Sequence, residues 1–385
     1  MNQIVRVFKS FASKKFNPNQ KISLSNIIFC CALVSICFSA YTRVSIGYSA
    51  AIFMGIMSLA IHLHTKKDTI AAVCVFVFLI SLKWLIQSSS PFFLVWSGIY
   101  FYGFCFFLIS GPVLKTQYEQ KLFICAFFLA GLTILDALLI NILGYQSWMT
   151  NYPDLDVLNG HRTSYFGSFQ RAYSFGTNAS ITSVCLVSIF FAVLSNFKRG
   201  FVKIVVLFSI LSAVAVSFSA TGIGTLIFGF FYLVRISKKL IVFLLALSVM
   251  SLSDNLWSSN LDLSYRLSTS YFSFLVSLKL SQLNVILVRF FDDPMEVFFG
   301  RKYTDITNLP FGDDFGWMSL LQTYGIIGLG VMACTVGYFI SRAEKSNRLP
   351  AIVLCIGTFH YGALFSLAGQ MLFSLYVVSK GRKNQ

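Results

Sequence analysis

The sequence predicts an all-α membrane protein that crosses the bilayer about twelve times, as a single integral domain over residues 1–385. Fifty-six per cent of the residues are hydrophobic, and the mean hydropathy is +0.74. The charged residues lie in gaps between long apolar runs. About 20 residues of helix cross about 30 Å of hydrocarbon, so each such run has the length of a membrane span.

Ten apolar runs are expected to form spans: 22–41, 47–64, 69–87, 91–114, 122–145, 175–195, 201–218, 221–236, 239–252 and 316–340. A final apolar stretch, 349–379, is long for one span and short for two. We expect two short helices that turn near Ala368-Gly369-Gln370, and one tilted helix is the alternative. The total is therefore twelve spans, or eleven.

The distribution of cations predicts the orientation of the chain. The net charge is +16, and 21 of the 30 Lys and Arg fall in the N-terminal segment and in every second gap. Lys and Arg favour the cytoplasmic side of a membrane, which explains the basic composition without a nucleic-acid partner. Both termini are thus expected in the cytoplasm, with the first apolar run retained as a span. Lys83 lies inside a span near its outer end, from which its side chain can snorkel.

This orientation places two large loops on the outer side, at about 146–174 and 253–315. In the second loop, the moderately apolar piece from Tyr271 to Leu287 predicts an amphipathic helix on the outer membrane face. Asp-Asp-Pro at 292–294 is expected to end it. All nine cysteines lie in apolar stretches, and the four histidines show no ligand spacing, so we expect no metal and no cofactor.

Arginines in these outer loops are the main functional candidates, because cations there oppose the topological bias. A guanidinium pairs phosphate oxygens through a planar fork of donors, which suits a lipid diphosphate at the outer leaflet. The alternative for each is an ion pair with one of the loop acids. Arg171 and Arg289 lead because each is near a span, and His161 beside Arg162 could join the site. The loop arginines are Arg162, Arg171, Arg266, Arg289 and Arg301.

Two acidic features carry weaker predictions. Asp136 lies in the outer half of the fifth expected span, where a transporter would use a carboxylate as an ion relay. A relay needs several such groups, and Asp136 is the one acid found within the expected spans. Asp154-Leu-Asp156 imitates a metal and nucleotide-sugar motif, but nucleotide-sugars are cytoplasmic and this loop is expected outside.

Several segments resemble the O-antigen polymerase and ligase superfamily. The segment RAYSFGTNA, which begins at Arg171, is similar to an Arg…Gly…Asn…Ala signature of that superfamily. Phe-Gly-Arg at 299–301, Asp-Asp-Phe-Gly-Trp at 313–317 and the Gly-Ile-Ile-Gly that begins at Gly325 are similar to its second outer loop and the next helix. Arg289 and Gly300 are separated by ten residues, as in polymerase outer loops, although the first loop lacks such a pair.

The resemblance implies a GT-C-like enzyme of a bacterial inner membrane that polymerises oligosaccharide repeats carried on undecaprenyl diphosphate, without a metal. It implies diphosphate binding by Arg171 and Arg289, with Arg266 or Arg301 in support, and a base at Asp313 or Asp314. The implied partners are the lipid-linked glycan, membrane lipid and a chain-length regulator protein. The further substrate-binding residues that it implies are His161, Arg162, Asn178 and Gly300.

Rival functions remain open. An O-antigen ligase would be favoured by a His at 313–314 and an Arg in the Ser217–Gly222 stretch, and this sequence has neither. A lipid-linked-oligosaccharide flippase would need charged residues within the spans, where only Lys83 and Asp136 are found. An assembly subunit of a cell-envelope complex is the third alternative.

Overall fold

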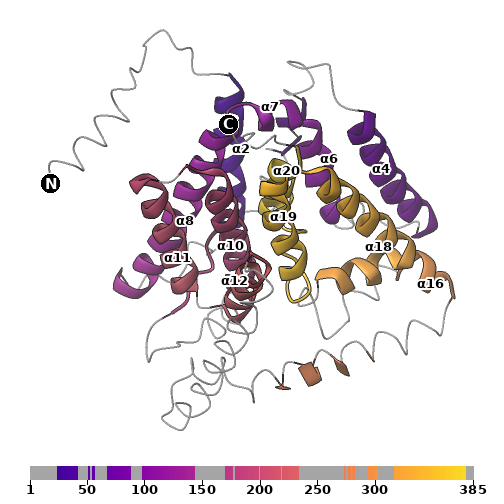
Figure 1. The fold of residues 1–385 in the computed structure, drawn as a ribbon. Helices are drawn as coiled ribbons and strands as arrows, with labels where there is room; N and C mark the ends of the chain where they lie inside the picture. Colours follow the sequence, from indigo (N-terminus) through magenta and orange to yellow (C-terminus); the bar gives the residue numbers. More distant parts are fainter. Residues whose placement is uncertain are drawn as a thin grey trace, which may run out of the picture.

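The computed structural model describes residues 24–41, most of 51–56, 67–87, 98–143, most of 170–233, parts of 273–284, 294–301 and 316–378. Every regular element within these ranges is a helix, so the expected all-α class is confirmed there. Figure 1 shows the helices side by side in a bundle. The expected span 239–252 and most of 47–64 lie outside the described residues.

Seven helices match predicted spans to within a few residues. They are α2 (Leu24–Tyr41), α4 (Lys67–Gln87), α8 (Tyr118–Leu143), α10 (Ala179–Asn196), α11 (Phe201–Ser217), α12 (Ala220–Leu233) and α18 (Gly316–Arg342). Within the described residues, four of them (α4, α8, α10 and α18) are long and apolar enough to cross a membrane. Shorter apolar helices accompany them. This composition indicates a protein embedded in a membrane.

The run 91–114 does not form one uninterrupted helix. Its described part contains η1 (Gly98–Tyr100), α6 (Tyr102–Ile109) and α7 (Gly111–Lys115). Pro112 stands in the first turn of α7, and it has no backbone N–H to continue the hydrogen bonding of α6. The break therefore follows from the proline, which hydropathy alone does not register.

The final apolar stretch forms two helices, as expected, but the turn position was wrong. α19 (Lys345–Gly357) and α20 (Leu367–Val378) are joined by residues 358–366, and Ala368–Gln370 lies in the first turn of α20. The Thr358 hydroxyl accepts the Leu364 N–H at 2.8 Å, and the Ser366 hydroxyl accepts the Gly369 N–H at 3.0 Å. Hydroxyl side chains thus satisfy backbone groups at the turn, and they place it there.

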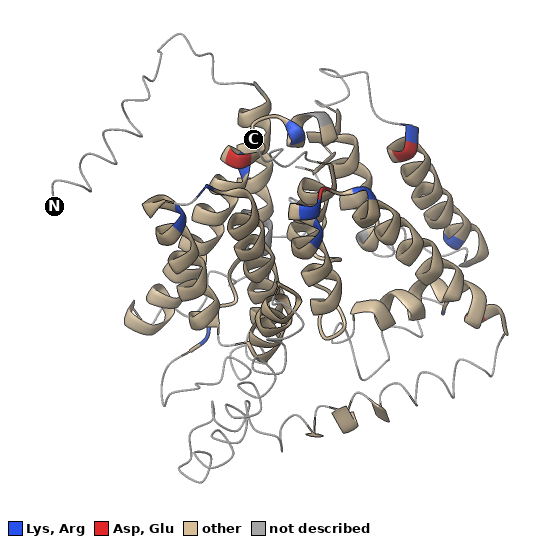
Figure 2. Ribbon diagram, in the orientation of Figure 1, with Lys and Arg blue, Asp and Glu red and all other residues tan. Residues whose placement is uncertain are grey.

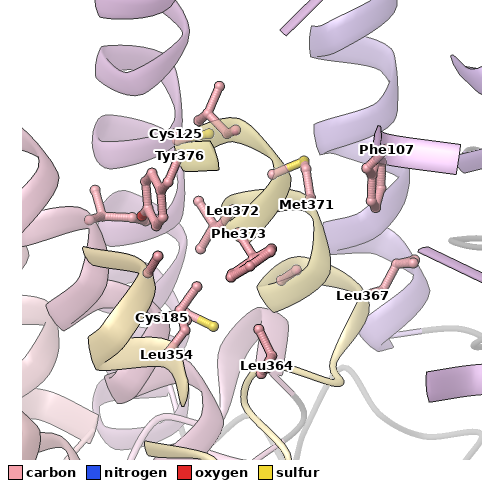
Figure 3. Packing of buried hydrophobic residues seen from close by; sticks show 14 of the residues in the cluster. Phe107, Cys125, Cys185, Leu354, Leu364, Leu367, Met371, Leu372, Phe373 and Tyr376 are labelled. Carbon is pink, nitrogen blue, oxygen red and sulfur yellow. The ribbon is translucent and has the colours of Figure 1, made fainter. Parts of the chain in front are cut away.

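Helix α20 lies in the middle of the bundle. Every residue from Leu367 to Tyr376 is buried. Figure 3 shows its side chains between Phe107 of α6 on one side and Cys125 and Cys185, of α8 and α10, on the other. The Tyr376 hydroxyl has a polar partner in this apolar setting, the Ser188 hydroxyl of α10 at 3.0 Å. Within a membrane, close packing of such side chains and interhelical hydrogen bonds stabilise the bundle core.

The bundle has two ends, and polar side chains are hydrogen-bonded to one another at one of them. At one end, the Asn347 side-chain oxygen accepts from Tyr118 and Asn196, both at 2.9 Å, and Tyr338 donates to Asp68 at 2.7 Å. We call this the basic end, because most described cations lie in or beside the first and last turns of helices there (Figure 2). These cations are Lys67, Lys115, Lys121, Lys198, Lys203, Arg342, Lys345 and Arg348.

The opposite end of the helices is called the loop end here. It contains the C-terminal turns of α4 and α8 and the first turns of α10 and α18, together with the described parts of both large predicted loops. In the second loop, α16 (Pro294–Phe299) begins at the proline that was expected to end a helix. The described residues between 273 and 284 are helical, as predicted. Their place on a membrane face stays a prediction.

Candidate functional site

The described end of the first loop is held by a buried carboxylate. Asp136 of α8 accepts the backbone N–H groups of Tyr173 and Ser174 at 3.1 and 3.0 Å. Ser174 opens η2 (Ser174–Gly176) with a φ of 49°, a left-handed conformation that a non-glycine residue adopts only when its surroundings support it. These bonds give Asp136 a structural role at this turn, which differs from the ion relay considered from the sequence.

Further hydrogen bonds attach the same segment to three helices. The Asn141 amide of α8 donates to the Gln170 carbonyl at 2.8 Å and accepts from its N–H at 2.7 Å. The Ala172 N–H donates to the Val216 carbonyl of α11 at 3.1 Å. The Thr182 hydroxyl of α10 donates to the Tyr173 carbonyl. Residues 170–174 are therefore held tightly against the bundle, on both sides of Arg171.

Arg171 is half-buried on this segment. Its guanidinium carbon lies 5.3 Å from the centre of the Tyr173 ring, and one of its nitrogens donates to the Tyr173 hydroxyl at 3.3 Å. Tyr173 is buried, so the ring provides a fixed surface for the cation. The structure thus places one of the two leading candidate arginines at the loop end, with its backbone position determined by buried contacts.

The start of α10 completes this part of the site. Asn178 is the N-cap residue, and its side-chain oxygen accepts the Ser180 N–H at 2.8 Å. Beside it, Ser219 in the α11–α12 junction donates to the Ser180 hydroxyl at 3.0 Å. Ser219 and Gly222 therefore pack against the start of α10. Asn178 has a clear structural task, and its substrate contact stays a prediction.

The described end of the second loop packs on α18. The Arg301 N–H donates to the Gln322 carbonyl at 2.7 Å. The Arg301 side chain is buried and pairs with Glu296 of α16 at 3.3 Å. Of the two interpretations weighed for the loop arginines, the geometry of Arg301 favours the ion pair within the loop. Its supporting contact with a diphosphate stays a prediction.

Two glycines allow the second loop to approach α18 this closely. Gly300 has a φ of 78°, and Gly325, inside α18, has a φ of 65° that breaks the helix. A Cβ on Gly300 would stand 2.3 Å from the Thr323 carbonyl oxygen, and one on Gly325 would stand 2.3 Å from the Phe298 carbonyl oxygen. Only glycine tolerates both the conformation and the contact. We call this the Gly300–Gly325 contact.

Lys83 joins this contact from α4, and here the sequence-based expectation was wrong. The side chain does not snorkel, because only 2% of it is exposed. Its ammonium donates to the Phe299 carbonyl at 2.7 Å and to the Arg301 carbonyl at 3.0 Å. Its position in the span was recognisable from the sequence, but its partners lie more than 200 residues further along the chain.

The turn between α19 and α20 lies between the two loop segments in Figure 1. The Trp317 indole of α18 donates to the Cys355 carbonyl of α19 at 2.9 Å. A Cβ on Gly316 would stand 2.7 Å from the Cα of Gly362 in that turn. On the other side, a Cβ on Gly357 would stand 2.2 Å from the Val184 side chain of α10. The end of α19 and its following turn thus pack against both α10 and the start of α18.

The other predicted site residues lie outside the described residues. They are His161, Arg162, Arg266, Arg289, Asp313 and Asp314. Within the described ranges, no group of three His, Cys, Asp or Glu side chains gathers in a way that could hold a metal. The described site therefore has two parts. One is Arg171, on the segment that Asp136 binds. The other, beyond the 358–366 turn, is Lys83 with the loop residues Phe299 and Arg301 that it binds.

Comparisons of the chain with protein-family models, with curated proteins and with solved structures gave no match.

Proposed function

We propose that this protein is a membrane glycosyltransferase that polymerises undecaprenyl-diphosphate-linked oligosaccharide repeats at the outer face of a bacterial cytoplasmic membrane. Arg171 is the observation that carries the proposal. It is a cation beside the ends of apolar helices, on a segment that Asp136 and Asn141 fix in position. A guanidinium held in place beforehand stabilises charge on a leaving diphosphate without reorganising.

The proposed reaction needs little beyond charge stabilisation from the protein. The hydroxyl of an acceptor sugar attacks the anomeric carbon of the donor, and the bond from that carbon to the diphosphate oxygen breaks. The diphosphate leaves as an anion, which Arg171 and Arg289 would bind. Asp313 or Asp314 would take the proton of the acceptor hydroxyl. A chain-length regulator remains a proposed partner.

The proposed arrangement in the membrane comprises about twelve GT-C-like spans, with both termini in the cytoplasm. The gathering of described cations at the basic end supports it (Figure 2), since Lys and Arg are retained on the cytoplasmic side. Both loop segments then face outward, where lipid-linked repeats are polymerised.

Deletion of the gene, followed by gel analysis of cell-surface glycan, tests the proposal. We expect the ladder of repeats to be lost while a single repeat stays attached. Loss of all glycan with accumulation of lipid-linked polymer would instead indicate the ligase reaction. An unchanged ladder would contradict both transferase functions.

Arg171→Ala and Arg289→Ala are each expected to lower ladder formation by at least about a hundredfold, with normal protein abundance. Arg171→Lys is expected to restore little, because an ammonium lacks the bidentate fork. Ser209→Ala is a suitable control, since this hydroxyl bonds only within the exposed face of α11, to Val205. A full ladder in Arg171→Ala would remove this arginine from the site.

A further inference from the structure

We infer that Lys83 is a positioning residue that locks the end of the second loop over the break in α18, an inference that rests on the proposed function for its effect on activity. An ammonium buried to 2% exposure is costly unless its protons are bonded. Both acceptors recorded for Lys83 belong to the loop, at Phe299 and Arg301. Neither belongs to α4 itself, so the lysine serves the loop and not its own helix.

Helix α16 depends on contacts outside itself, because its six residues are too few to be stable alone. Within the segment, the Gly300 N–H donates to the Glu296 carbonyl at 2.8 Å. Lys83 satisfies the Phe299 carbonyl, and the Arg301 N–H is bonded to Gln322. The lysine and the Gly300–Gly325 contact therefore hold the segment from two sides.

The consequence is that residues 299–301, near the end of the second predicted loop, have a fixed position at the loop end of the bundle. The segment 299–301 is followed directly by the chain that carries the candidate base at Asp313 or Asp314 and returns at Gly316. Release of Phe299 and Arg301 from Lys83 would remove two bonds that hold residues 299–301 beside the ion pair of Arg301 with Glu296. Lys83 itself touches no substrate in this scheme.

Lys83→Met tests the inference, because methionine retains most of the apolar stem and removes the ammonium. The first readout is maleimide labelling of Thr323→Cys in full-length protein purified in detergent, where orientation does not matter. Thr323 is 1% exposed and lies under Gly300. Without the lysine, two carbonyl groups lose their partner, and we expect labelling to accelerate about tenfold or more. The matching Lys83 variants without Thr323→Cys give the background from native cysteines.

Lys121→Met is the matched control. Lys121 is fully buried, and its ammonium also donates to two backbone carbonyls, those of Val113 and Thr116, but at the basic end. A role in global stability alone would lower the abundance of both variants alike. We expect only Lys83→Met to accelerate labelling at position 323 and to lower the glycan ladder, per amount of folded protein, by about tenfold.

Unchanged labelling in Lys83→Met would overturn the lock, and accelerated labelling with a full ladder would overturn its positioning role. If gene deletion leaves surface glycan unchanged, the proposed function fails, and the labelling result still decides whether the lock exists.

Discussion

At the scale of single residues, two buried charges at the loop end bind backbone groups of the loops. Asp136 accepts N–H groups of the first loop, and Lys83 donates to carbonyl groups of the second. Backbone dipoles thus compensate each charge, and bonds of this kind are stronger than those between neutral groups. Each of the two loop segments is therefore bonded to one of these charged side chains, in addition to its other contacts.

Asp136→Ala is expected to destabilise the protein by about 2–4 kcal/mol, because it leaves two buried N–H groups without an acceptor. Asp136→Asn keeps an amide oxygen in place and is expected to cost less. Thermal unfolding in detergent measures both. Ser209→Ala, on the exposed face of α11, provides the reference. Equal stability of Asp136→Ala and the parent protein would show that these bonds contribute nothing.

The sequence did not predict which groups these buried charges would bind. Asp136 and Lys83 stood out as charges in apolar runs, and hydropathy with the positive-inside rule located most helices. The roles differ from expectation because a bonding partner depends on tertiary contact. Lys83 is 216 residues from Phe299, and Asp136 is 37 residues from Tyr173. Arg171 was recognised as a candidate by its place near a span, while Gln322 and Thr323 gave no signal of their own.

At the scale of elements, the main departure from expectation is that apolar runs do not remain single straight helices. Pro112 begins a new helix in the run 91–114, and Gly325 breaks α18. A hydropathy window averages over such positions, because proline and glycine change backbone geometry more than they change apolarity. The turn between α19 and α20 was displaced for a similar reason, since hydroxyl side chains determine it.

Gly325→Ala is expected to lower stability by at least about 2 kcal/mol, through left-handed strain and overlap with the Phe298 carbonyl. Gly330→Ala lies in the same helix, where an added Cβ meets nothing within 4 Å, and it is expected to be neutral or mildly stabilising. Denaturation of the two purified variants compares them directly. A Gly325→Ala variant as stable as Gly330→Ala would show that the Gly300–Gly325 contact does not require glycine.

At the scale of the whole molecule, the distribution of cations and the positions of the helix ends indicate the same orientation. Short cationic connections lie beside helix termini at the basic end, and the described ends of both large predicted loops lie at the other end. An orientation with the loop end outside keeps these cations in the cytoplasm. The total number of spans and the identity of the membrane are parts of the proposal.

Reporter fusions test this orientation. Alkaline phosphatase, which is active only outside the cytoplasm, is expected to be active when it is fused within 253–315 and inactive when it is fused after Lys198 or Arg342. A cytoplasmic reporter at the same sites should give the reverse pattern. Phosphatase activity at the basic-end sites would place the arginine-bearing loops on the wrong side of the membrane for the proposed substrate.

The central place of α20 has a consequence for biogenesis. Its neighbours α6, α8, α10 and α19 all leave the ribosome before it does. Until α20 arrives, they must surround an unfilled space, which lipid tails or loosely packed side chains would occupy in the meantime. Completion of the bundle is therefore a late event in synthesis, and a nascent chain that is released early would offer membrane quality-control proteases an incomplete substrate.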